Sequence, residues 1–185
     1  ASHFSQFLNK RGWRLNLKGY RLDDAIEHIE QGHVADKVTY QNLIDHFIDK
    51  ETSNQPEATG ASASLRKFKN YAEIIILTNV PHRAYSKRIK NLSALKMNYP
   101  TVSNSGLKGP ALQAISKLPQ NICVFIDDNP FQIASAAKFT PHIYRFHFSA
   151  CDLVKTTMPY SEEATHRPSS WHELNQLINQ LLGLA

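Results

Sequence analysis

The sequence has few cysteines and no long apolar runs or internal repeats. Its 185 residues include two cysteines, Cys123 and Cys151, too few to suggest the disulfide framework of a small secreted domain. No run of about 18 apolar residues occurs, which argues against a membrane-spanning helix, and no secretory signal is visible. These absences favour a cytoplasmic protein that does not span a membrane.

Neither the charge nor the hydrophobic content is extreme. Hydrophobic residues make up 42% of the chain, enough for an ordinary packed core, and a chain of this length suits one domain with at most a small insertion. The net charge of +5 would suit a polyanionic partner. However, the basic residues are scattered, and the tightest group, Arg83 to Lys90, has the spacing of a solvated helix face. Nucleic-acid binding is therefore not expected.

The pattern of apolar residues changes near residue 60. Before it, helical spacing predicts helices at 2–10, 22–31 and 39–50, and an extended segment at 13–17. A polar connection rich in small residues follows, from Glu51 to Ala63. After it, apolar strands alternate with helices, which is typical of parallel strands joined by right-handed crossovers. We therefore expect an all-helical lobe (1–60) and an α/β lobe (61–185).

The second lobe is expected to hold strands at 73–77, 99–102, 122–126 and 143–148. Helices are expected at 65–71, 83–95, 111–118 and after Pro130, and a last helix begins at a capping box formed by Ser170 and Glu173. The strands at 73–77 and 122–126 show no polar alternation, which predicts burial on both faces. Cys123 is then a small core residue.

Two adjacent carboxylates end the strand at 122–126. Asp127 and Asp128 precede Asn129-Pro130, which turns the chain into a helix. In open α/β sheets, ligands bind at the carboxyl ends of the strands, and neighbouring carboxylates repel each other unless a cation lies beside them. Because Mg²⁺ prefers oxygen ligands, the pair predicts a Mg²⁺ site. The plainer alternative is a helix N-cap at Asp128 or Asn129 with a solvated Asp127.

Further polar groups are expected at the same edge. Thr78 and Asn79 end the strand at 73–77, and Lys108 lies in a turn before a helix. A hydroxyl and nearby backbone amides can hold phosphate oxygens, and a lysine can neutralise phosphate charge. Mg²⁺ held by the acids can stabilise the transition state of phosphoryl transfer. The order and placement of these groups favour a site for a small phosphorylated substrate.

These residues resemble the motifs of the haloacid dehalogenase (HAD) superfamily of phosphohydrolases. Its second motif, a hydrophobic strand ending in Ser or Thr, is similar to residues 74–79. Its third, a lysine at a helix start, is similar to 106–110, and its fourth, a strand ending in an acidic pair, to 124–128. The resemblance covers about residues 61–148. It implies a three-layer, Rossmann-like α/β core with a mostly parallel sheet, and makes residues 2–55 a small helical cap.

The resemblance also implies roles for the site residues. Thr78 and Lys108 would be catalytic, with Thr78 binding phosphoryl oxygens and Lys108 balancing their charge. Asn79 would assist in binding the substrate, and Asp127, with Asp128, would hold Mg²⁺. The implied activity is Mg²⁺-dependent hydrolysis of a small phosphorylated metabolite through an aspartyl-phosphate intermediate.

The first motif of that family, a strand ending in Asp-x-Asp, is missing from the sequence. In the family its first Asp is the nucleophile, and the strand lies at the centre of the sheet. Without it, the sheet would have a gap of about 9–10 Å flanked by unpaired backbone groups. We therefore expect the native chain to carry a further N-terminal strand. The alternative is a catalytically inactive relative that binds a phosphorylated ligand or a protein partner.

Overall fold

The computed structural model describes residues 1–18, 22–116 and 121–184. In chain order the first elements are α1 (Ser2–Asn9), β1 (Trp13–Leu15), β2 (Ile26–His28), α2 (Lys37–Glu51), the 3₁₀ turn η1 (Thr52–Asn54) and α3 (Ala61–Phe68). They are followed by β3 (Ile76–Thr78), the 3₁₀ turn η2 (His82–Ala84), α4 (Tyr85–Ala94), β4 (Thr101–Ser103) and α5 (Gly109–Ile115). The last are β5 (Val124–Asp127), α6 (Pro130–Phe139), β6 (Tyr144–His147), α7 (Asp152–Thr157) and α8 (Trp171–Leu181). Within these residues, every helix is too short or too polar to cross a membrane.

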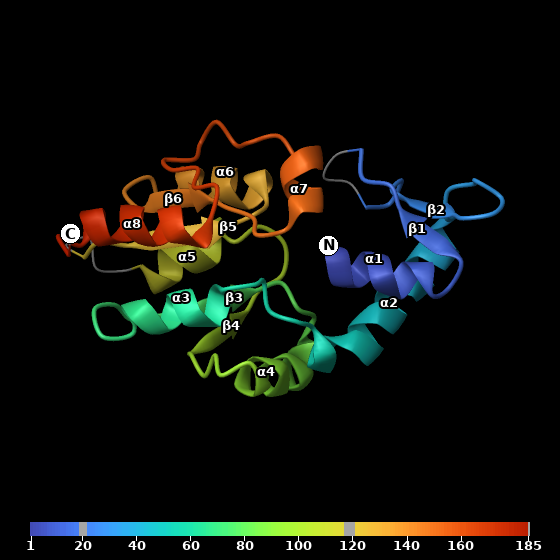
Figure 1. Cartoon of the computed structure of the whole chain (residues 1–185), viewed down its shortest axis with the longest axis horizontal. Helices are drawn as coiled ribbons and strands as arrows, with labels where there is room; N and C mark the ends of the chain where they lie inside the picture. Colours follow the sequence, from blue (N-terminus) through green and yellow to red (C-terminus); the bar gives the residue numbers. More distant parts are fainter. Residues whose placement is uncertain (19–21, 117–120, 185) are drawn as a thin grey trace.

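The first lobe contains a strand pair as well as helices, so the expectation of an all-helical lobe is wrong. The helices expected at 2–10 and 39–50 are confirmed as α1 and α2, and the extended segment at 13–17 contains β1. However, the segment expected to be a helix at 22–31 contains β2, which pairs antiparallel with β1. Figure 1 shows this lobe beside the larger α/β lobe, with α7 of the larger lobe facing it.

The error at β2 has a clear physical cause. Leu22, Ala25, Ile26 and Ile29 are spaced as on one helix face. In the structure Ile26 is fully buried, while Ile29 is 44% exposed. Between them Glu27 accepts hydrogen bonds from Arg14 Nη2 at 2.8 Å and Asn16 Nδ2 at 2.7 Å. These cross-strand partners for a buried carboxylate favour the strand over the helix, since a buried charge needs partners.

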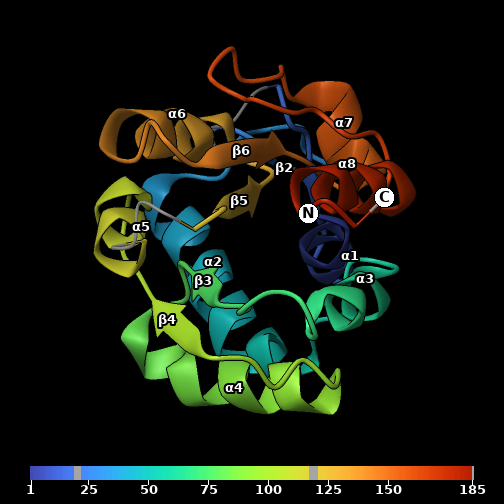
Figure 2. The ribbon, with the colours of Figure 1, turned by 90° about the vertical axis from the view of Figure 1, so that its left-hand side faces the viewer.

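The second lobe is mixed α/β, with short strand pairs that are parallel. β3 pairs with β4, placing Thr78 opposite Ser103, and β5 pairs with β6, placing Asp127 opposite His147. The helices α4 and α6 connect the strands of each pair. In Figure 2, α5 lies on one side of β3 and β5, and α3 and α8 lie on the other. The α/β alternation expected after residue 60 is therefore confirmed.

The expected single, mostly parallel sheet is not formed by the residues that the structure describes. Each sheet has two strands, and β3 and β5 belong to different sheets. Between them lies a groove of about 420 Å³, lined mainly by apolar side chains that include Ile76, Leu77, Phe125 and Ile126. Among the described residues, β3 and β5 therefore each pair with one strand only.

The groove also explains why burial on both faces was the wrong expectation for the two apolar strands. Ile75 is 39% exposed and Ile122 is 49% exposed, and both line the groove. Cys123, expected in the core, is only partly buried and lines the same groove. An apolar segment without a neighbour on one edge leaves part of its side-chain surface accessible.

The remaining expectations for the second lobe are mostly confirmed. The helix expected at 111–118 is α5, although residues 117 and 118 lie outside those described. At α8, the Ser170 hydroxyl accepts a hydrogen bond from Glu173 N, while the Glu173 carboxylate accepts from Ser169 N. The short helix α7 was not predicted. The division of the chain at residue 60 stays a prediction.

Candidate functional site

A buried ion pair forms the centre of the site. Lys108 Nζ donates a hydrogen bond to Asp127 Oδ2 at 2.6 Å, and the two side chains are 14% and 6% exposed. Lys108 lies at the start of α5 and Asp127 at the end of β5. The structure therefore brings together two of the residues selected from the sequence. Removing either partner would leave a buried charge unpaired.

The loop before α5 fixes the position of Lys108. The carbonyl oxygen of Gly106 accepts hydrogen bonds from Asn79 Nδ2 at 2.8 Å, Asn104 Nδ2 at 3.2 Å and Gln132 Nε2 at 3.3 Å. Gln132 Oε1 in turn accepts from the backbone N–H of Lys108 at 2.7 Å. Gly106 has φ +78°, a left-handed conformation that glycine adopts without steric cost. This loop joins β4 to α5 in the chain, and the hydrogen bond from Asn79 ties it to the end of β3.

Gly109 allows α5 to approach α6 closely. Its backbone N–H donates to Ser135 Oγ at 3.0 Å. A Cβ atom added at Gly109 would lie 2.4 Å from the Ser135 carbonyl oxygen and 2.7 Å from a ring carbon of Phe139. A larger residue would therefore push α5 away from α6, and Lys108 would move with it.

Asp127 also organises the turn into α6. Its Oδ1 accepts from Asn129 N at 2.9 Å, and Asn129 Oδ1 accepts from Phe131 N at 2.9 Å. Asn129 is therefore the N-cap of α6, as expected in the alternative that placed a helix N-cap at Asp128 or Asn129. The other part of that alternative is wrong, because Asp127 is buried and paired with Lys108 rather than solvated.

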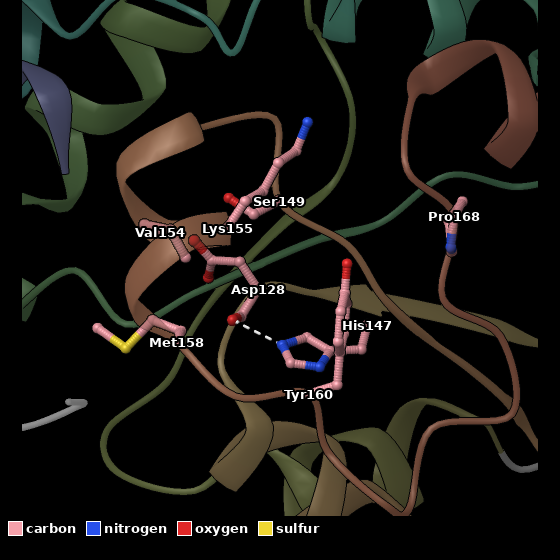
Figure 3. Close-up of a pocket in the computed structure, with 8 residues that line it drawn as sticks. All are labelled: Asp128, His147, Ser149, Val154, Lys155, Met158, Tyr160 and Pro168. Atoms are coloured by element: carbon pink, nitrogen blue, oxygen red, sulfur yellow. Dashed lines mark hydrogen bonds between the residues drawn. The ribbon is translucent and has the colours of Figure 1, made fainter.

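Asp128 differs from Asp127 in its surroundings. Its side chain is exposed and points towards α7 in Figure 3. The pKa of Asp128 is raised above its ordinary value, first by desolvation from the surrounding protein atoms and second by the charge of Asp127. Asp128 therefore ionises less readily than an ordinary aspartate.

His147 holds the backbone of Asp128 in place. Its Nδ1 accepts from Ser161 N at 2.9 Å, which leaves the proton on Nε2, and Nε2 lies 3.0 Å from the Asp128 carbonyl oxygen. Both ring nitrogens thus have backbone partners, and Figure 3 shows the bond to Asp128. The cavity beside these residues measures about 20 Å³, room for about one water molecule and too little for a substrate.

The acidic pair fits a hard divalent cation in part. Mg²⁺ commonly takes one or two protein carboxylates and completes its shell with water and phosphate oxygens. Asp127 and Asp128 can supply those carboxylates, and a cation between them would offset their repulsion, which after desolvation is the second cause of the raised pKa of Asp128. No group of three or more His, Cys, Asp or Glu side chains suited to a metal occurs in the parts of the chain described.

Thr78 and Asn79 lie at the end of β3, on the margin of this network. The Thr78 carbonyl oxygen accepts from Asn104 N at 2.8 Å. The Asn79 amide is used twice, since it donates to Gly106 and its Oδ1 accepts from Asn104 Nδ2 at 2.9 Å. Asn79 therefore supports the loop that carries Lys108. Contact of either side chain with a substrate stays a prediction.

Two side chains of α6 that the sequence motifs do not predict also support the site. Gln132 and Ser135 are buried and bond to the backbone of Lys108 and Gly109, respectively. They lie three positions apart and hence on one helix face. Two polar side chains at that spacing, in a helix rich in alanine, are the signal that could have identified them.

No protein-family model matches the chain, and no curated protein matches it significantly. The functional interpretation therefore depends on the geometry described above and on the motifs of the sequence.

Proposed function

We propose that this site hydrolyses a small phosphorylated metabolite with Mg²⁺, in the manner of the HAD superfamily. The observation that supports it best is the buried pair of Lys108 and Asp127, 2.6 Å apart, at the end of β5 and beside the exposed Asp128. A lysine held against a carboxylate at a strand end is suited to placing positive charge beside a phosphoryl group. The cytoplasmic location expected from the sequence belongs to the same proposal.

Each residue has a defined task in this reaction. Thr78 binds a phosphoryl oxygen, and Asn79 holds the loop that carries Lys108. Lys108 offsets the negative charge of the phosphoryl group, while Asp127 keeps the ammonium group in place. Mg²⁺ bound by Asp127 and Asp128 would supply further charge stabilisation.

The proposal requires a nucleophilic aspartate on a strand between β3 and β5. One of its carboxylate oxygens attacks phosphorus, the P–O bond to the alcohol breaks, and the second Asp of the Asp-x-Asp motif gives its proton to the leaving alcohol, which yields an aspartyl-phosphate. Water then gives a proton back to that second Asp as it attacks phosphorus, which releases inorganic phosphate and regenerates the nucleophilic carboxylate. The groove between β3 and β5 supports this position, because its lining is mostly apolar and, among the described residues, each of the two strands pairs with one strand only. It would also complete the three-layer core that the motifs imply.

The test restores this strand. The first step is to read the gene upstream of the Ala1 codon for an apolar strand ending in Asp-x-Asp. The chain is then expressed with that segment, or with a designed one joined to Ala1, and Mg²⁺-dependent hydrolysis of 4-nitrophenyl phosphate is measured. The matched control replaces the first Asp of the added motif with Asn.

Activity should occur with Asp and fall at least 100-fold with Asn or with Lys108→Ala, since each change removes a group used in the transition state. Full activity in the Lys108→Ala variant would contradict the proposed role of the ion pair.

A second candidate function is binding without catalysis. It is favoured by one observation: among the described residues, Asp127 is the one aspartate that ends a strand of the two parallel pairs. In this case a phosphorylated ligand or a protein partner would occupy the site. Saturable phosphate binding that depends on Lys108, without turnover in the strand-restored chain, would identify this function.

A further inference from the structure

A second hollow lies where the first lobe meets the α/β lobe. This cleft has a volume of about 370 Å³, within the usual range of about 300–1,000 Å³ for small-molecule sites. Its floor on the α/β lobe includes Asp128 and Asn129. Its wall on the first lobe is formed by eight apolar residues: Ala1, Phe4, Leu15, Leu17, Leu22, Ile44, Phe47 and Ile48.

The opposite wall is also apolar. Val154 and Met158, at α7 and its C-terminal end, face the cleft from the α/β lobe. Asp128 is the one charged side chain among the described residues that line it. The cleft therefore has a single acidic end, next to the proposed phosphoryl site, and apolar side walls.

The cations of the nearby β-hairpin are engaged elsewhere. Arg14 Nη2 lies 2.8 Å from Glu27 Oε2, and Lys18 Nζ lies 3.5 Å from Glu27 Oε1. Neither side chain is among those lining the cleft. The hairpin thus presents leucines to the cleft and keeps these two positive charges beside Glu27.

We propose that this cleft binds the organic group of the substrate, and that this group is an apolar aliphatic or aromatic one. This inference rests on the proposed function, because it places the phosphoryl group at the acidic end. A sugar or other hydroxyl-rich group would lose hydrogen bonds to water against these walls without replacing them. An apolar group instead gains about 25 cal/mol for each Å² removed from water.

The test measures binding, so that it does not depend on turnover. Calorimetric titration with Mg²⁺ present compares 1-naphthyl phosphate, glycerol 1-phosphate, 1-naphthol and inorganic phosphate. Two variants add polarity to opposite walls of the cleft, Ile48→Ser on α2 and Met158→Gln. The matched control is Val38→Ser, which changes another β-branched residue of α2 whose side chain is 69% exposed and lies outside the cleft.

We expect 1-naphthyl phosphate to bind at least about tenfold more tightly than glycerol 1-phosphate. Ile48→Ser should weaken its binding about tenfold, as expected for polarity introduced into an apolar pocket, and Met158→Gln should weaken it several-fold. Val38→Ser should change nothing, and inorganic phosphate should bind all four proteins equally. Thermal melts confirm that the variants are folded.

Equal affinities for the naphthyl and glycerol esters would overturn the inference, as would a difference that survives both cleft variants. Failure of the proposed function gives a different result. If 1-naphthol binds in a manner sensitive to Ile48→Ser while inorganic phosphate does not bind, the apolar cleft is supported and the phosphohydrolase site is not.

Discussion

At the residue scale, the site depends on neighbouring carboxylates in different surroundings. Asp127 is buried, and its two oxygens have partners in Lys108 Nζ and Asn129 N. Asp128 is exposed, and its pKa is raised by desolvation and by Asp127. One acid therefore contributes to the framework of the site, while the other faces the cleft and has a destabilised negative charge.

Asp128→Asn should stabilise the protein near neutral pH. Because the folded-state pKa of Asp128 is raised, its carboxyl contributes to the free energy of unfolding when protonated. This contribution is complete below the unfolded-state pKa. That contribution is lost as pH rises through the folded pKa. An exposed charge contact of about 0.5 kcal/mol corresponds to an increase in Tm of about 1–2 °C for a chain of this size.

The measurement is a thermal melt of both proteins near pH 7 and again near pH 3. The increase in Tm should occur near pH 7 and vanish near pH 3, where the carboxyl is protonated in both states. Added Mg²⁺ should reverse the order near pH 7 if the cation binds the pair, since Asn lacks the charge. A lower Tm for Asp128→Asn near pH 7 without Mg²⁺ would contradict the repulsion argument.

At the element scale, the contact between α5 and α6 holds Lys108 in place. Gly109→Ala should destabilise the protein by about 1–3 kcal/mol, the usual cost of overpacking, because the added Cβ would lie 2.4 Å from a backbone oxygen of α6. Urea denaturation measures the loss. Ala114→Ser, which adds one atom on the exposed face of α5, should change stability by less than about 0.5 kcal/mol. Equal stability of the Gly109→Ala variant and the parent would show that α5 is free to shift.

Elements could be predicted from the sequence where one local signal dominated. The capping residues Asn129 and Ser170 are used as expected, and the strand ends at Thr78 and Asp127 are correct. The apolar spacing around β2 predicts a helix, but the segment forms a strand because Glu27 then accepts hydrogen bonds from Arg14 and Asn16 on and beside β1. Gln132 and Ser135 were missed because their importance depends on the packing of α6 against the loop before α5, which spacing alone does not reveal.

At the scale of the whole molecule, the two parallel pairs are the feature that the HAD-like motifs bear on most directly. The motifs implied a strand between those ending in Thr78 and Asp127, and the described chain supplies none. In the structure the two parallel pairs stand apart, with an apolar groove of about 420 Å³ between them. Strand edges and apolar surface exposed in this way favour association with other chains.

This groove should bind apolar dyes in the native state. We expect 1-anilinonaphthalene-8-sulfonate to fluoresce with the folded protein, and Ile75→Lys to lower that signal by about half, because a charge in the groove opposes burial of the dye's apolar rings. Ile29→Lys is the matched control, since Ile29 is 44% exposed, similar to the 39% of Ile75, but lies on the first lobe. Native-state dye fluorescence and light scattering measure binding and association.

The same experiment tests whether a strand fits the groove. An apolar strand joined to the chain for the phosphatase assay should abolish the dye signal and reduce scattering, because it would cover the apolar walls and pair with β3 and β5. Loss of the signal in Ile29→Lys, or an unchanged signal in Ile75→Lys, would place the dye elsewhere. A signal that persists after the strand is added would mean that the two pairs do not join into one sheet, and the nucleophile would then lack its position beside Lys108.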